Sequence, residues 1–78
     1  MADEPTLVLD CTGMRCPLPV IELTRHLEDV AVDEVIGVVA DDPAAKSDVP
    51  AWCRLRGQEF VGAQRHGSAR LYLVRRLT

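Results

Sequence analysis

The chain has 78 residues, of which 47% are hydrophobic and 27% are charged, so we expect one small domain, residues 1–78, with a single thin core. No apolar run approaches the ~18 residues of a membrane span, and the short acidic N-terminus does not resemble a signal or transit peptide. The odd number of cysteines, three, argues against a disulfide framework and fits a reducing compartment. We therefore expect a cytoplasmic protein with no membrane partner.

The net charge of −3 hides two halves of opposite sign. Residues 1–53 hold 11 acidic and 3 basic side chains, whereas residues 54–78 hold 1 acidic and 6 basic ones. The basic half is a candidate docking surface for an acidic partner or RNA, or else a set of solvated strand-edge and helix-face charges. Direct nucleic-acid binding is not expected, because no RNA-binding motif or aromatic ladder accompanies these residues. The docking candidates are Arg54, Arg56, Arg65, Arg70, Arg75 and Arg76.

The first half of the chain predicts a strand, a helix and a second strand. Residues 6–9 form a short apolar run that contains β-branched side chains, which is typical of a strand. Residues 17–29 repeat apolar side chains at helical spacing and therefore predict an amphipathic helix. Residues 34–40 form a nearly continuous apolar strand of the kind found inside a sheet, where Gly37 would allow a helix to approach closely.

The second half predicts a helix followed by a hairpin. Residues 41–45 indicate a cap and a helical turn, and a helix is expected over residues 48–56, with Pro50 in its first turn and Gly57 as its C-cap. Two strands are expected near residues 59–65 and 69–76, joined by a tight turn.

The predicted order, βαβαββ, indicates an α/β (α+β) fold. A right-handed crossover makes the first two strands parallel and places both helices on one face of the sheet, which gives a two-layer sandwich with one open sheet face. Alternation in the last strand predicts that Leu71 and Leu73 face the helices, with Tyr72 and Val74 on the other side.

Cys16 is the candidate reactive residue, because it lies where the first strand gives way to the first helix. With Cys16 as N-cap, Pro17 and Pro19 occupy first-turn positions at which a missing N–H costs little. The helix dipole, a free Leu18 N–H and the charge of Arg15 are then expected to lower the pKa of the thiol. The pattern therefore predicts a nucleophilic thiolate at Cys16.

The residues around Cys16 are expected to have supporting roles. Gly13 is available for a tight bend, and Asp10 is expected to accept backbone hydrogen bonds rather than act as a base, since a nearby carboxylate would raise the thiol pKa. Cys11 is expected to pack at the strand end, with a Cys11–Cys16 disulfide as the alternative, and Cys53 is expected to be inert core. The cysteine and histidine spacing does not indicate a metal site.

Three segments together resemble the TusA/SirA-like family of small sulfur-carrier proteins, and the match covers nearly the whole chain. These segments are Asp10-x-x-Gly13-x-x-Cys16-Pro17-x-Pro19, Ala40-Asp41-Asp42-Pro43-Ala44 and Asp48-Val49-Pro50-x-Trp52-Cys53. The Cys-Pro-x-Pro element is the signature of that family. The resemblance implies a mixed four-stranded sheet with two helices on one face.

The resemblance also implies that Cys16 accepts a sulfane sulfur as a persulfide, with no cofactor or metal. The expected donor is a cysteine desulfurase or a rhodanese-type protein, and the expected recipient is a downstream acceptor protein in tRNA thiolation, molybdenum-cofactor synthesis or other sulfur trafficking. Such a sulfurtransferase is a weak catalyst on its own, and the pathway does not carry over from the resemblance. The alternative is a non-catalytic regulatory or adaptor module that binds protein or RNA through its basic half and does not need Cys16.

Overall fold

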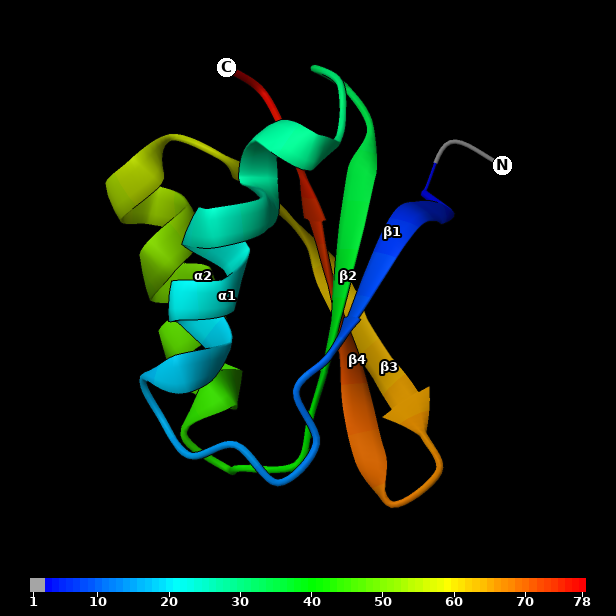
Figure 1. The fold of residues 1–78 in the computed structure, drawn as a ribbon, viewed down its shortest axis with the longest axis vertical. Coiled ribbons are helices and arrows are strands. Elements are labelled where there is room, and N and C mark those ends of the chain that lie inside the picture. The colour runs from blue at the N-terminus through cyan, green and yellow to red at the C-terminus, as the bar shows by residue number, and fades with distance from the viewer. Residues whose placement is uncertain (1–2) are drawn as a thin grey trace.

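The computed structural model describes residues 3–78 and shows a two-layer α+β sandwich. Its elements are β1 (Pro5–Asp10), α1 (Leu18–His26), the 3-10 turn η1 (Leu27–Asp29), β2 (Val35–Ala40), α2 (Ala45–Arg56), β3 (Glu59–His66) and β4 (Ala69–Arg75). The strands form one sheet in the order β1-β2-β4-β3, in which β1 and β2 are parallel and the other neighbours are antiparallel. Both helices cover the same face of this sheet (Figure 1), so the predicted mixed sandwich is confirmed.

The main core lies between the helices and the sheet. Strand β2 is buried along its whole length, and its alternate residues Ile36 and Val38 face the helices. Leu23 from α1 and Val49 from α2 pack against them and are fully buried. Burial of side chains of this size stabilises the fold by roughly 1.5–3 kcal/mol each. This packing holds both helices against the sheet. None of the helices in residues 3–78 combines the length and apolar character needed to span a bilayer.

The predicted orientation of β4 is wrong. Tyr72 and Val74 pack in the core under the helices, whereas Leu71 and Leu73 point to the open face. Both faces of β4 are apolar, so the period-two pattern separates its side chains into two sets without showing which set the helices cover. The second cluster, on the open face, consists of Val35, Val39, Leu71 and Leu73.

Gly37 has a different role from the one predicted. A Cβ at this position would lie 2.9 Å from Cδ1 of Leu71, which is a side chain of the open face. The close approach that the glycine allows is therefore made by a neighbouring strand, not by a helix.

Both helix starts differ from their predicted positions. The N-cap of α1 is Pro17, so Pro19 is the second helical residue and Cys16 lies outside the helix. Helix α2 begins at Ala45, which places Pro50 inside it. The earlier start follows a turn in which the Ala44 N–H donates to Oδ1 of Asp42 at 3.0 Å. The predicted C-cap is confirmed, because Gly57 adopts the left-handed conformation at φ +72°.

Candidate functional site

The cysteine loop, residues 11–17, is held by the residues that follow β2. Because β1 and β2 are parallel neighbours, their carboxyl ends meet at one edge of the sheet. The Gly13 N–H donates to Oδ1 of Asp41 at 3.0 Å, and the Cys16 N–H donates to Oδ2 of Asp42 at 2.8 Å. Two carboxylates from one loop therefore set the backbone position of Cys16 in the other.

A turn inside the cysteine loop brings the chain back toward α1. Oδ1 of Asp10 accepts the Thr12 N–H at 3.0 Å and the Thr12 hydroxyl at 2.6 Å, and these bonds lower the pKa of Asp10. Gly13 follows with φ +82°, a conformation that favours glycine. Asp10 and Gly13 thus have the turn-forming contacts that the sequence suggests for them.

The Cys16 side chain is exposed and donates its thiol hydrogen to Oδ2 of Asp48 on α2. This hydrogen bond, together with desolvation and the negative charges of Asp48 and Asp42, raises the pKa of the Cys16 thiol above its ordinary value. The prediction of a lowered pKa is therefore wrong for the free protein, which favours the neutral thiol.

The groups expected to stabilise a thiolate have other partners. The Leu18 N–H donates to the Arg15 carbonyl at 2.8 Å, so it does not point at the sulfur as predicted. The charge of Arg15 acts on Asp42, whose pKa is lowered first by hydrogen bonds from Ala44 and Cys16 and then by this arginine. The sulfur consequently faces a carboxylate where the sequence predicted a cation and a free N–H.

Beside Cys16 a groove runs between α1 and α2. Its lining is mostly apolar and consists of Cys16, Pro17, Val20, Asp48, Ala51, Trp52 and Leu55. The indole Nε1 of Trp52 donates to Oγ1 of Thr24 at 2.9 Å, which links the two helices across the groove. Large apolar side chains are exposed on the same helices: Leu18 by 48%, Ile21 by 44% and Leu55 by 82%.

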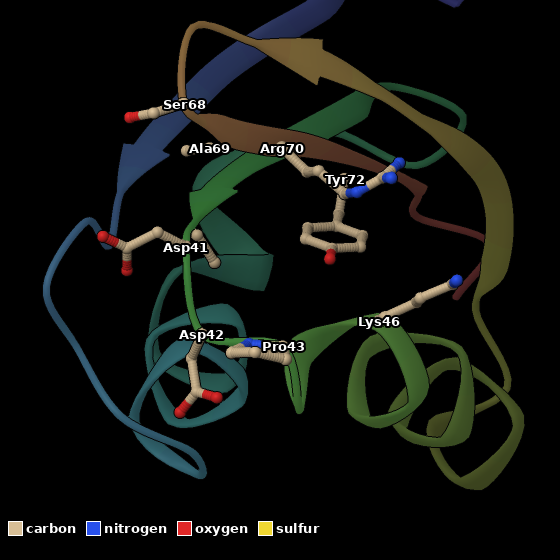
Figure 2. Close-up of a pocket in the computed structure, with 9 residues that line it drawn as sticks. Asp41, Asp42, Pro43, Lys46, Ser68, Ala69, Arg70 and Tyr72 are labelled. Atoms are coloured by element: carbon tan, nitrogen blue, oxygen red, sulfur yellow. The ribbon is translucent and has the colours of Figure 1, made fainter.

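A second pocket lies on the other side of the loop after β2, and Cys16 does not line it (Figure 2). The Tyr72 hydroxyl points into this pocket from β4, with the Lys46 side chain at its edge. The carboxylates of Asp41 and Asp42 point away from Tyr72 and toward the cysteine loop. The thiol therefore opens onto the helix groove and is separated from this pocket.

The other two cysteines are buried. Cys11 and Cys53 are each 1% exposed, and all three cysteines are free thiols. Burial raises the pKa of Cys11 and raises the pKa of Cys53 to about 11. Within residues 3–78, no three cysteine, histidine or acidic side chains gather in a way that could hold a metal ion.

The sequence model of the family described as "Sulfurtransferase TusA" matches residues 7–76. The chain belongs to the TusA family. It is 38% identical over 68 residues to the sulfur carrier protein TusA of Pseudomonas entomophila, across 87% of this chain and 85% of the relative. It is 36% identical over 76 residues to the sulfur carrier protein TusA of Pseudomonas aeruginosa strain LESB58, across 97% and 96% of the two chains.

A solved structure shares the fold of this TusA-family chain. The SirA-like protein of Desulfitobacterium hafniense superposes with a TM-score of 0.73 at 17% identity, covering 90% of this chain and 95% of that one. The family and the fold predicted from the sequence motifs are thus confirmed.

We expect only one thiol of the native protein to react with iodoacetamide. Cys16 is exposed, whereas Cys11 and Cys53 are buried, which shields both sulfurs from the reagent and raises the pKa of both thiols. Brief treatment at pH 8 should add one carbamidomethyl group in the native state and three after unfolding in denaturant, as measured by intact-mass spectrometry. Equal labelling of Cys53 and Cys16 in the native protein would contradict this expectation.

Two of the predicted docking arginines are engaged within the chain. Arg75 forms ion pairs with Asp3 and, at 3.2 Å, with Glu59. Arg76 donates to the carbonyls of Val30 at 2.7 Å and Thr78 at 2.9 Å. These contacts join the end of β4 to neighbouring segments, so both side chains serve the fold.

The other four docking candidates are exposed but not clustered. Arg54 and Arg56 lie in the last turn of α2, at the end of the molecule opposite the cysteine loop (Figure 1). Arg65 and Arg70 are register partners on β3 and β4. The basic half of the sequence therefore does not form a single surface beside the cysteine.

Sequence reasoning missed three carboxylates as members of the site. The sequence predicts a cap and a helical turn over residues 41–45 and a helix over residues 48–56, whereas Asp41, Asp42 and Asp48 all contact the cysteine loop. The position of Asp41 and Asp42 directly after a strand parallel to β1 was a usable signal, because the ends of such strands meet. The contact of Asp48 depends on how α1 and α2 pack, and it has no local signature.

Proposed function

We propose that Cys16 accepts a sulfane sulfur as a persulfide and passes it to an acceptor protein. The observation that carries this proposal is that Cys16 is exposed at the start of α1 in a TusA-family fold, while Cys11 and Cys53 are buried. The TusA proteins of the two Pseudomonas species, which match nearly the whole chain, are named sulfur carriers. We infer that this chain is a sulfur carrier that uses a single thiol.

The proposed transfer proceeds in two displacement steps. Sγ of Cys16 attacks the outer sulfur of a donor persulfide and forms a new S–S bond, while the donor S–S bond breaks. The electron pair stays on the inner sulfur of the donor, which takes up the proton from Cys16. An acceptor thiolate then attacks the terminal sulfur, and Cys16 leaves as a thiolate. The sulfur is held covalently, so this scheme uses no cofactor and no external oxidant.

The position of Cys16 suits delivery into a partner's active site. The side chain projects from a loop rather than from an enclosed cavity, and Pro17 and Pro19 follow it closely in the chain. The loop backbone is nevertheless fixed by Asp41 and Asp42. A sulfur that is exposed and also held in place can be presented to two different partners in turn, a cysteine desulfurase or rhodanese-type donor and an acceptor protein.

The test is sulfur loading followed by intact-mass spectrometry. After incubation with a cysteine desulfurase and cysteine, the protein should gain the mass of one sulfur atom, and dithiothreitol should remove it. Peptide mapping of alkylated, loaded protein should locate the added sulfur on Cys16. An absence of mass gain with both a desulfurase and a rhodanese-type donor, or loading on Cys11 or Cys53, would contradict the proposal.

The donor is expected to cover the groove between α1 and α2 as it reaches Cys16. Leu55 lines this groove and is 82% exposed, so a glutamate there should leave folding unchanged but introduce a charge into the contact. We expect Leu55→Glu to slow loading by about tenfold, which corresponds to about 1.4 kcal/mol of lost binding. The measurement is the initial rate of mass gain at a donor concentration below saturation.

Leu77→Glu is the matched control, because Leu77 is 43% exposed and lies outside the groove. It should load at the wild-type rate. Equal slowing by both substitutions would show that added negative charge, and not the groove, determines the rate.

A further inference from the structure

The contact between Cys16 and Asp48 distinguishes this thiol from an ordinary exposed cysteine. Asp48 lies in the first half of α2 and lines the same groove as the sulfur, to which it is linked by the thiol hydrogen bond. The other charged groups nearby are Asp42, which binds the Cys16 N–H, and Arg15, whose charge acts on Asp42. The sulfur is therefore placed among carboxylates.

This arrangement opposes loss of the thiol proton. A carboxylate accepts a hydrogen bond from S–H, but it can donate nothing to S⁻ and repels it. Desolvation adds to the effect but comes second to the Asp48 hydrogen bond, because the cysteine is exposed. The acid–base state of Cys16 is thus set mainly by one side chain from another element.

We propose that Asp48 acts as a gate that holds the empty carrier as a neutral, weakly reactive thiol. The gate restricts reaction of Cys16 with small electrophiles and oxidants when no partner is bound. This inference rests on the proposed carrier function for its biological meaning, although the chemical reactivity of Cys16 can be measured without any sulfur donor.

The Asp48 carboxylate is expected to affect the loaded carrier differently. Once Sγ is bonded to a second sulfur it carries no hydrogen, so it can no longer donate to Asp48. The terminal sulfur lies one S–S bond of about 2.05 Å farther out. Repulsion by the carboxylate should turn this sulfur away from Asp48 and toward solvent. The gate thereby restrains the empty thiol and leaves the transferable sulfur reactive.

The experiment compares Asp48→Asn with the wild-type protein by iodoacetamide alkylation of Cys16 across pH 6 to 10. Asparagine matches aspartate in shape but is neutral, and its amide can donate to a thiolate. The alkylation rate of Asp48→Asn should therefore rise at lower pH than that of wild type. At pH 7 the variant should be alkylated about three- to tenfold faster than wild type, since a more abundant thiolate outweighs a modest loss of nucleophilicity. Superimposable profiles for the two proteins would overturn the gate.

Two further variants separate the gate from a structural effect. Asp29→Asn removes an exposed carboxylate of η1 that lies outside the groove, and it should alkylate like wild type. Asp48→Glu keeps the charge and should retain most of the restraint. If Asp48→Glu reacts as fast as Asp48→Asn while thermal melts show intact folding, the charge is not the cause and the gate is refuted.

A last comparison uses the loaded protein. In wild type, the persulfide form should be alkylated at a higher rate than the thiol form. Asp48→Asn should bring the two rates closer together, because it accelerates only the empty form. If the ratio of the persulfide rate to the thiol rate were the same in Asp48→Asn and wild type, the gate would be contradicted. Failure of loading in both proteins would instead count against the carrier function and leave the alkylation result in place.

Discussion

Cys16→Ser is expected to reduce sulfur loading by at least about 100-fold, to the detection limit of intact-mass spectrometry. A serine hydroxyl can replace the thiol as donor to Asp48, but it is not ionised at neutral pH and cannot form a persulfide. The side chain is exposed, and the loop is held by backbone contacts to Asp41 and Asp42 that the substitution preserves. The variant should therefore fold normally while losing the reaction.

Cys53→Ala is the matched control for this variant. It also removes one thiol, but the thiol is buried in the core and is remote from any donor. This control should load one sulfur at a rate close to that of wild type, provided that the temperature is well below its unfolding midpoint. Loading of Cys16→Ser to wild-type levels would exclude Cys16 as the sulfur carrier.

Cys16→Ser also distinguishes the sulfur-carrier function from the adaptor alternative. If the protein works only as a binding module, Cys16→Ser should restore the phenotype of a deletion strain as fully as the wild-type gene does. If the protein works as a sulfur carrier, Cys16→Ser should not restore the phenotype. Complementation by a variant that has lost loading in vitro would therefore favour the adaptor.

Local patterns were sufficient to predict the element order and the place of Cys16. The continuous apolar run of β2 marked a strand buried on both faces, and Gly57 marked a helix end at which only a left-handed residue fits easily. The position of Cys16 between a strand and a helix followed from the same patterns. These features depend on residues close together in the chain, which is why they can be inferred without a structure.

The errors arose where distant segments meet. On β4 both sets of alternating side chains are apolar, and only the packing of the helices shows that Tyr72 lies beneath them and Leu71 on the open face. The thiol pKa had the wrong predicted direction for a similar reason. The nearest charge in the sequence is Arg15, whereas the nearest partner in space is Asp48, 32 residues away along the chain.

Replacing Leu23 with alanine is expected to lower the free energy of unfolding by about 2–5 kcal/mol, because it removes a fully buried side chain and leaves a cavity between α1 and the sheet. A chain of 78 residues has a total stability of roughly 4–12 kcal/mol, so this is a large part of it. The unfolding midpoint should fall by about 10–30 °C, as measured by circular dichroism or calorimetry. Ile21→Ala is the matched control on the same helix, since Ile21 is 44% exposed, and it should change stability by less than about 0.5 kcal/mol.

The core substitution also tests how far the site depends on the helix. The backbone of Cys16 is tied to Asp42, in the loop after β2, by the 2.8 Å hydrogen bond, whereas Leu23 anchors only the middle of α1. Folded Leu23→Ala, kept well below its lowered midpoint, should therefore load sulfur at a rate within about threefold of wild type. A much larger loss of loading in fully folded protein would show that α1 packing, and not the loop contacts alone, positions the sulfur. Equal destabilisation by Ile21→Ala and Leu23→Ala would instead contradict the assignment of Leu23 to the core.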